Sequence, residues 1–177
     1  MKLVILDRDG VINYDSASYI KTPDEWKPIP GSLEAIAQLS QAGYHVIVAT
    51  NQSGVGRGLF EMATLNAIHD KMHRALGQLG GRIDAVFFCP HALDNGCNCR
   101  KPKPGLFHEI ARRFNANLKD VPSIGDSLRD LEASAAAGAQ PILVLTGKGQ
   151  KTSRDGGLPP GTVIYADLAE AVESIIT

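Results

Sequence analysis

The amino-acid sequence predicts an α/β domain of the doubly wound type, in which helices cover both faces of a parallel sheet. Two observations lead to this fold class. Short apolar runs rich in β-branched residues alternate along the chain with longer segments of helical periodicity. These runs are apolar throughout, as in strands that are buried on both faces. The length of 177 residues fits one domain, which we expect to span residues 1–177.

The first half of the chain begins with an expected strand at residues 3–6, LVIL, and a helix at 32–43, where apolar residues recur at helical spacing. A second strand is expected at 45–50 and a third at 85–88. Between them lies a long helix, because five apolar residues fall on one of its faces. These residues are Leu65, Ile68, Met72, Leu76 and Leu79.

The second half continues with a helix at 106–114, a short strand ending at 123–125 and an Ala-rich helix at 128–138. Strands follow at 142–145 and 163–165, before a short terminal helix. In a doubly wound sheet, ligands bind beyond the carboxyl ends of the strands. The residues that follow each strand are therefore the first candidates for a functional site.

The composition excludes several classes of function. With 44% hydrophobic residues, 21% charged residues and a formal net charge of −1, the chain does not resemble a general binder of nucleic acid or of anionic membranes. No apolar stretch approaches the roughly 18 to 20 residues that cross a bilayer, and Asp7 interrupts the N-terminal apolar run. We expect a cytoplasmic monomer without nucleic-acid or membrane partners.

All three cysteines lie in one short segment, CPHALDNGCNC, at residues 89–99. Cys89, His91, Cys97 and Cys99 form the pattern C-x-H-x5-C-x-C, with a turn-forming Asp-Asn-Gly at 94–96 between the halves. Three thiolates and one imidazole suit tetrahedral Zn²⁺ in a structural site. Free buried thiols are the alternative that the spacing leaves open.

Carboxylates follow two of the predicted strands. Asp7 and Asp9 come where the first strand ends, and Asp126 follows the strand at 123–125. Oxygen donors that converge from separate strand ends suit Mg²⁺. The alternative is that Asp7 is a turn residue and Asp126 caps the following helix. Thr50 and Asn51 follow the middle strand and add the hydroxyl and amide donors that a phosphoryl group needs.

Four segments resemble the four motifs of the haloacid dehalogenase superfamily of phosphatases, in the same order and over nearly the whole chain. They are DRDGVIN (7–13), ATNQSG (49–54), RKPKPG (100–105) and GDSLRD (125–130). Within the superfamily the sequence resembles the heptose bisphosphate phosphatases, with the histidinol-phosphate phosphatases as the alternative. NQSGVGRG (51–58) and KPKPG favour the heptose branch, and therefore a small sugar bisphosphate as the substrate.

The resemblance implies a mechanism. Asp7 attacks the phosphorus and becomes an aspartyl-phosphate, while Asp9 protonates the leaving oxygen and then activates water. Thr50 and Lys101 hold the phosphoryl oxygens. Mg²⁺ is held by the carboxylates of Asp7 and Asp126 and by the backbone carbonyl of Asp9.

The resemblance also implies the residues that contact the rest of the substrate. These are Asp15, Tyr19, Asn51, Gln52, Ser53 and Arg100. Arg100 is expected to bind the distal phosphate or the sugar, since a guanidinium suits paired oxygens. Members of the family bind zinc through the cysteine pattern, and we expect that zinc to fix the loop from which Arg100 and Lys101 project.

The motif spacing leaves no room for a cap domain, so the site should be open. An open site disfavours the phosphomutases, which need a lid to exclude water. A non-enzymatic, zinc-stabilised phosphate-binding module is a remote alternative, because such a module would not need both Asp7 and Asp9.

Other features are assigned no function. His69 and His73 have i, i+4 spacing but lack the Glu of a zinc-protease helix, so we expect them at the surface or its boundary. Trp26 lies among prolines and is expected to be a packing anchor. Residues 147–161 are rich in Gly, Pro and polar residues, and predict a solvated loop, although Lys148 could contact an anionic ligand.

Overall fold

The computed structural model describes residues 1–92 and 96–177. Six parallel strands form one sheet in the order β3-β2-β1-β4-β5-β6. The strands are β1 (Lys2–Leu6), β2 (Tyr44–Asn51), β3 (Ala85–Cys89), β4 (Pro122–Gly125), β5 (Gln140–Val144) and β6 (Val163–Tyr165). This is the strand order of the Rossmann-like doubly wound fold. The predicted fold class is confirmed.

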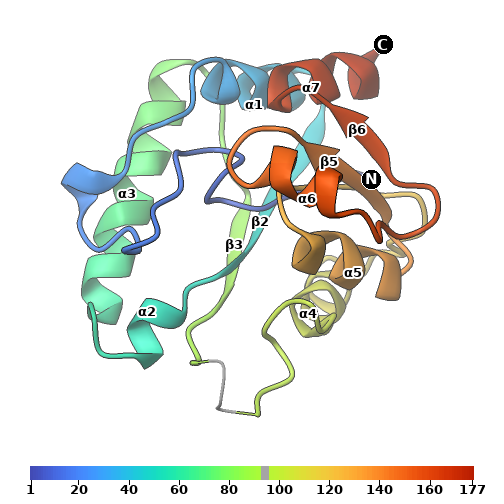
Figure 1. The fold of residues 1–177 in the computed structure, drawn as a ribbon. Coiled ribbons are helices and arrows are strands. Elements are labelled where there is room, and N and C mark those ends of the chain that lie inside the picture. Colours follow the sequence, from blue (N-terminus) through green and yellow to red (C-terminus); the bar gives the residue numbers. More distant parts are fainter. Residues whose placement is uncertain (93–95) are drawn as a thin grey trace.

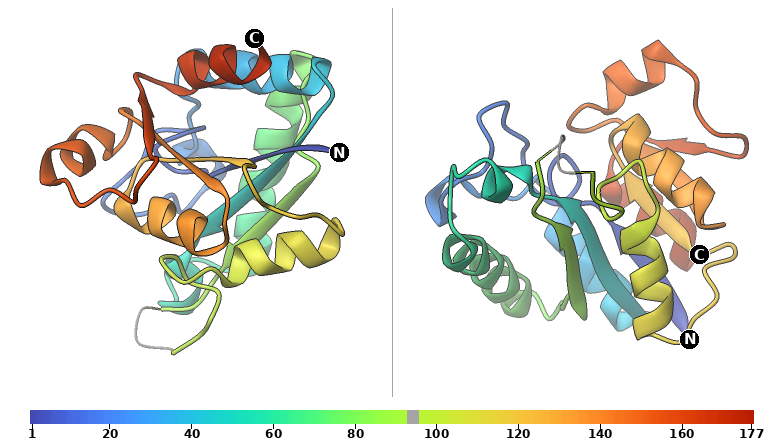
Figure 2. Two further views of the ribbon diagram at one scale, coloured as in Figure 1. Left: turned by 90° about the vertical axis from the view of Figure 1, so that its right-hand side faces the viewer. Right: turned by 90° about the horizontal axis from the view of Figure 1, so that it is seen from below.

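Helices cover both faces of the sheet (Figure 1). They are η1 (Pro23–Glu25), α1 (Ser32–Gln41), α2 (Ser53–Gly56), α3 (Met62–Gln78), α4 (Gly105–Arg113), α5 (Leu128–Ala136), α6 (Gly149–Asp155) and α7 (Leu168–Ile176). Buried residues of α1, α3 and α7 belong to one hydrophobic cluster, and those of α4 lie in a second. The two views of Figure 2 show the sheet between these helical layers.

Alternate residues of the inner strands contribute to the two clusters. In β1, Val4 and Leu6 pack into the first cluster, and Leu3 and Ile5 pack into the second. Successive side chains of a strand point to opposite faces, so a strand covered on both sides must be apolar at every position. This requirement explains the continuous apolar runs of the sequence.

The order in which the strands follow one another reverses at β1, which lies between β2 and β4. Leu6 is in register with Val48 of β2 and with Ile124 of β4. The Asp7 amide continues the pairing, since it donates to the Ile124 carbonyl at 2.9 Å. The chain leaves β1 and its two neighbours at one edge of the sheet, where side chains from three strand ends meet.

The structure confirms the expectation of an uncapped domain at this edge. Residues 7–31, between β1 and α1, contain η1 as their only helix and form no strand of the sheet. The segment from β2 to β3 holds only α2 and α3. Neither insertion point therefore carries a second domain. None of the helices in the described ranges combines the length and the apolar character needed to cross a bilayer.

Three sequence expectations need correction or restriction. Leu79 was expected on the buried face of the long helix, but α3 ends at Gln78 and Leu79 is 42% exposed. The segment at 147–161 is not a plain loop, because it contains α6. The turn expected at 94–96 lies mostly outside the described residues.

The packing role expected for Trp26 is confirmed. Its side chain is buried, and Lys71 of α3 donates from Nζ to the Trp26 carbonyl at 2.8 Å. The same ammonium lies 5.8 Å from the centre of the indole ring. Trp26 thus ties the segment before α1 to α3, beside the first hydrophobic cluster.

The end of α3 offers a matched test of the core. Leu76 is fully buried, whereas Leu79, three residues later, is exposed. We expect Leu76→Ala to lower the free energy of unfolding by about 2 to 5 kcal/mol, because it leaves a cavity. Leu79→Ala should change it by less than about 1 kcal/mol. Urea unfolding followed by circular dichroism measures both, and equal losses would contradict this boundary of the core.

Candidate active site

The loops beyond the strand ends enclose a cavity of about 210 Å³. Its lining includes all of the residues that were predicted to be catalytic, to hold magnesium or to bind substrate. They are Asp7, Asp9, Asp15, Tyr19, Thr50, Asn51, Gln52, Ser53, Arg100, Lys101 and Asp126. Four further charged residues also line the cavity. They are Arg57, Arg129, Asp130 and Lys148.

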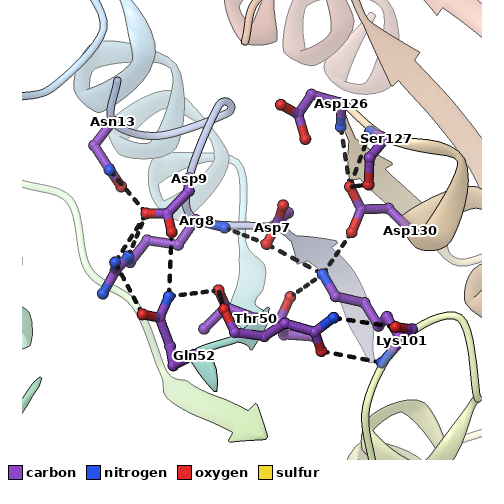
Figure 3. Close-up of polar contacts among 12 residues, drawn as sticks. Asp7, Arg8, Asp9, Asn13, Thr50, Gln52, Lys101, Asp126, Ser127 and Asp130 are labelled. Carbon is purple, nitrogen blue, oxygen red and sulfur yellow. Dashed lines mark hydrogen bonds and ion pairs between the residues drawn. The ribbon is translucent and has the colours of Figure 1, made fainter. Parts of the chain in front are cut away.

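One of the groups that line the cavity is a buried ammonium. Lys101 is 2% exposed, and its Nζ lies 3.1 Å from Asp7 Oδ1 and 2.6 Å from Asp130 Oδ1 (Figure 3). It also donates to the Ala49 carbonyl at 2.8 Å. Burial alone would lower the pKa of Lys101, but the two carboxylates raise it above its ordinary value. Lys101 is therefore charged at neutral pH.

Asp130 was not among the predicted site residues. Its Oδ2 accepts hydrogen bonds from the backbone N–H groups of Asp126 and Ser127, each at 3.1 Å, and from the Ser127 hydroxyl at 3.0 Å. Ser127 is the N-cap of α5 in a capping box with Asp130. The alternative in which Asp126 caps this helix is therefore wrong. The signal in the sequence was the second carboxylate of GDSLRD, one helical turn after the first.

Three carboxylates lie close enough to hold one cation. Oxygen atoms of Asp7, Asp126 and Asp130 all lie within 4.8 Å of one another. Burial and the neighbouring carboxylates raise the pKa of Asp7 to about 7 and that of Asp126 to about 8. Asp130 already bonds to Lys101 and Ser127, so Asp7 and Asp126 are the two carboxylates that best fit Mg²⁺.

Gly10 and Gly147 can pack closely against the Asp126 carboxylate only because they lack side chains. A Cβ on Gly10 would lie 2.0 Å from Asp126 Oδ2, and one on Gly147 would lie 2.2 Å from the same oxygen. The backbone N–H of Lys148 donates to this oxygen at 2.9 Å. The segment after β5 is thus part of the site, which corrects the expectation of a solvated loop at its N-terminal end.

The carboxylate of Asp9 is held away from Asp7 by a separate network (Figure 3). Asp9 Oδ1 accepts from Arg8 Nε at 2.9 Å, forms an ion pair with Arg8 Nη2 at 2.8 Å, and accepts from Asn13 Nδ2 at 3.0 Å. Asp9 Oδ2 accepts from Gln52 Nε2 at 3.3 Å. Burial would raise the pKa of Asp9, but Arg8 and these donors hold it below its ordinary value.

His69 of α3 contacts the guanidinium of Arg8. Both residues are buried, and Arg8 Nη1 lies 3.0 Å from His69 Nε2. Burial and the nearby guanidinium lower the pKa of His69 from its ordinary 6.5 to about 3. His69 was expected at the surface or its boundary, and that expectation is wrong because the ring packs beneath the site. His73 is exposed, as expected.

The last residues of β2 and the first residues after it line the side of the cavity. Thr50 is buried, and its hydroxyl accepts from Gln52 Nε2 at 3.0 Å. Asn51 bonds to the backbone of Lys101 in both directions, at 3.0 Å through Oδ1 and at 3.1 Å through Nδ2. The Asn51 side chain therefore positions Lys101, and Gln52 joins Thr50 to the Asp9 network.

The rim of the cavity is rich in cations. Lys148 Nζ lies 3.5 Å from Asp15 Oδ2 across the mouth. Arg57, Arg100 and Arg129 also line the cavity. Arg100 has two buried nitrogens, Nε and Nη1, without a hydrogen-bond partner in the described part of the chain. Guanidinium nitrogens without a partner, in a residue that lines the cavity, favour an anionic group nearby.

The four predicted zinc ligands form one cluster. The ligand atoms of Cys89, His91, Cys97 and Cys99 lie within 4.8 Å of one another. His91 Nδ1 lies 3.3 Å from Cys99 Sγ and 3.5 Å from Cys89 Sγ, while Cys89 Sγ and Cys97 Sγ are 3.5 Å apart. The cysteines are not joined as disulfides. Three sulfur atoms and one ring nitrogen at this spacing fit a tetrahedral zinc ion.

The chain also resembles known proteins over its whole length. The D-glycero-β-D-manno-heptose-1,7-bisphosphate 7-phosphatase of Bordetella bronchiseptica is 61% identical over 176 residues, which cover 99% of this chain and 98% of that protein. The enzyme of the same name from Pseudomonas putida is 54% identical over 176 residues, covering 99% of this chain and all of that one. The chain belongs to this phosphatase family.

Solved structures agree with this assignment. The B. bronchiseptica enzyme, crystallised with magnesium and phosphate, matches with a TM-score of 0.99 at 61% identity, covering 99% of this chain and 98% of that one. The Burkholderia thailandensis enzyme matches with a TM-score of 0.81 at 55% identity, over 100% of this chain and 99% of that one. The chain is thus a phosphoric monoester hydrolase with the haloacid dehalogenase fold.

Two family models match parts of the chain. The model for HAD-hydrolase-like proteins matches residues 98–171, and that for polynucleotide kinase 3 phosphatases matches residues 2–132. Together they span the four motifs that the sequence analysis identified. The relatives that match the whole chain place it among the heptose bisphosphate phosphatases rather than the nucleic-acid enzymes.

The buried His69 predicts acid sensitivity. Its pKa is near 6.5 when unfolded and about 3 when folded, so below pH 6.5 the unfolded chain binds a proton that the folded chain does not. Stability is therefore lost as the pH falls from 6.5 toward 3. Between about pH 7.5 and 5.5 we expect the wild type to lose about 1 kcal/mol more than His69→Gln. Urea unfolding at both values tests this.

His73→Gln on the exposed side of α3 is the matched control for this measurement. It should keep the acid sensitivity of the wild type, because its ring is exposed in the folded chain. An identical loss in the wild type and in His69→Gln would contradict the assignment.

Proposed function

We propose that this phosphatase removes the 7-phosphate of D-glycero-D-manno-heptose 1,7-bisphosphate in a cytoplasmic step of bacterial heptose biosynthesis, on the route to lipopolysaccharide. The observation that carries the proposal is the cavity itself. It joins a partly buried carboxylate, Asp7, to a basic rim that can take a second phosphate. Relatives that carry this substrate in their name, at up to 61% identity among those compared, support the choice of sugar.

In the first step, an Asp7 carboxylate oxygen attacks the phosphorus, and the bond from phosphorus to the sugar oxygen breaks. Asp7 Oδ1 already accepts from Lys101 and from the Arg8 backbone N–H, which leaves Oδ2 as the better placed oxygen. Asp9 gives its proton to the departing sugar oxygen. The products of this step are the sugar monophosphate and an aspartyl-phosphate.

In the second step, water replaces the carboxylate on phosphorus. Asp9, now ionised, takes a proton from this water, and the bond between phosphorus and Asp7 breaks to release inorganic phosphate. The lowered pKa of Asp9 favours the ionised form with which this step begins. A phosphoryl dianion in the cavity adds negative charge near Asp9 and makes its ionised form less favourable. The dianion therefore favours the protonated form of Asp9 that the first step needs.

The charge of the phosphoryl group is balanced by Lys101 and by the hydroxyl of Thr50, both of which line the cavity. Mg²⁺, bound by the Asp7 and Asp126 carboxylates and the Asp9 backbone carbonyl, would supply further neutralisation between nucleophile and phosphate. Asp130 keeps Lys101 in place from the opposite side.

The second phosphate is assigned to the rim, where Arg100 has unpaired buried nitrogens. Asp15, Tyr19, Gln52 and Ser53 are proposed to contact the sugar, since they line the same cavity. A histidinol-phosphate substrate has only one phosphate and would leave the cationic rim unpaired.

The substrate proposal is tested by comparing two esters. With Mg²⁺ present, we expect kcat/KM for heptose 1,7-bisphosphate to exceed that for histidinol phosphate by at least about 100-fold, because the second leaves buried polar groups unpaired. Release of inorganic phosphate measures both rates. A preference for histidinol phosphate would overturn the proposed substrate and leave the phosphatase assignment intact.

The nucleophile is tested by Asp7→Asn. We expect kcat to fall at least about a thousandfold, because an amide oxygen is a poor nucleophile, while the affinity for the phosphate ester is largely kept. Asp24→Asn, at the exposed η1, is the matched control with unchanged activity. Turnover near the wild-type level in Asp7→Asn would sink the mechanism.

The segment that carries the four predicted zinc ligands supports Lys101 and Arg100. The Cys89 carbonyl accepts from the Gln52 backbone at 2.8 Å, and Lys103 donates to the Cys97 carbonyl at 2.8 Å. Gly105 at the start of α4 comes so close that a Cβ would lie 2.2 Å from the Asn98 carbonyl oxygen. The loop therefore packs against both the second-motif loop and α4.

Loss of zinc should therefore weaken substrate use. We expect zinc removal or Cys99→Ser to lower kcat/KM at least about tenfold, because Arg100 and Lys101 lose their rigid base. Metal analysis, circular dichroism and phosphate release are measured on the same sample, and re-added zinc should restore the wild type. A folded, zinc-free protein with unchanged kcat/KM would refute this role.

A further inference from the structure

The guanidinium of Arg8 is completely buried and touches three different side chains. Its Nε and Nη2 bind Asp9, its Nη2 also donates to Gln52 Oε1 at 3.3 Å, and its Nη1 bonds to His69. A buried guanidinium needs acceptors for its N–H groups. Arg8 therefore keeps this orientation only if all three partners accept hydrogen bonds.

His69 is the acceptor on the side away from the cavity. Arginine can only donate, so His69 Nε2 must be the unprotonated nitrogen and the ring must be neutral. Because a neutral acceptor does not balance the positive charge of Arg8, the carboxylate of Asp9 balances it. A carboxylate at this position would instead compete with Asp9 for the same charge.

The network distinguishes the two oxygens of Asp9. Oδ1 is bound by Arg8 and Asn13, whereas within residues 1–92 and 96–177 Oδ2 has only the 3.3 Å contact from Gln52. Asp9 lines the cavity and is partly exposed there. With Oδ1 held from behind, Oδ2 is the oxygen that can exchange a proton with the leaving group or with water.

We propose that His69 is a positioning residue for the reaction: by accepting from Arg8 Nη1 it orients the guanidinium that fixes Asp9 Oδ1, so that Oδ2 is presented to the reacting oxygen. His69 does not line the cavity around Asp7. It lines a different cavity of about 290 Å³ between α3 and β3. The inference rests on the proposed acid and base role of Asp9.

Three variants test this idea. In His69→Gln the amide oxygen can replace Nε2 as the acceptor, whereas His69→Leu has similar bulk but cannot accept a hydrogen bond. His73→Leu on the exposed side of α3 is the control. If His69→Leu does not fold by circular dichroism, His69→Asn replaces it, because the shorter amide does not reach Arg8.

The readout compares two leaving groups in single-turnover experiments with Mg²⁺. A sugar oxygen needs protonation as it leaves, whereas 4-nitrophenolate leaves without it. We expect His69→Leu to slow the first turnover of heptose 1,7-bisphosphate at least about tenfold, within the range that general acid catalysis contributes, and to leave the release of 4-nitrophenolate within about twofold. His69→Gln and His73→Leu should match the wild type with both substrates.

Equal slowing with both substrates in a folded His69→Leu, or no slowing with either, would overturn the positioning role. Asp9→Asn separates this result from a failure of the proposed mechanism. If Asp9→Asn loses the sugar substrate selectively while His69→Leu does not, Asp9 is the acid and His69 does not position it. If Asp9→Asn shows no selective loss, the acid role of Asp9 fails, and the inference for His69 fails with it.

Discussion

The arrangement of the active site depends on the burial of one ammonium group between two carboxylates. Lys101 is almost wholly removed from water, with Asp7 on one side and Asp130 on the other. Removing either carboxylate would leave a buried charge without a full partner, which costs several kcal/mol. This constraint links the third motif, which carries Lys101, to the first and fourth motifs across the ends of three strands.

The residues around this ion pair fix the positions of Lys101 and Asp130. Asn51 fixes the backbone of Lys101, and the Ser127–Asp130 capping box fixes Asp130 at the start of α5. Behind them the cysteine cluster packs against the loop after β2 and against α4. A metal ion held by that cluster would have a structural role, because its four ligands would all be protein side chains and they lie outside the cavity lining.

The two carboxylates that are proposed to be catalytic, Asp7 and Asp9, have opposite environments although they are two residues apart. Asp7 lies among other carboxylates, and its pKa is raised, whereas Asp9 turns toward Arg8, and its pKa is lowered. The chain has left β1 after Leu6, so the alternation of a strand no longer sets these directions, and Asp9 is bound instead by Arg8 and Asn13. These environments agree with the proposed roles, in which Asp7 shares a cation and attacks while Asp9 exchanges protons.

The sequence alone determined the fold class, the positions of the strands and more than half of the residues that line the cavity, because strand burial demands apolar runs and the motifs follow the strand ends. It did not reveal Asp130 as the second partner of Lys101, His69 beneath Arg8, or Lys148 against Asp126. These pairs are separated by 22 to 61 residues in the chain. Periodicity tells which face of an element is buried, but which side chains meet across that face is decided only when helices and strands pack together.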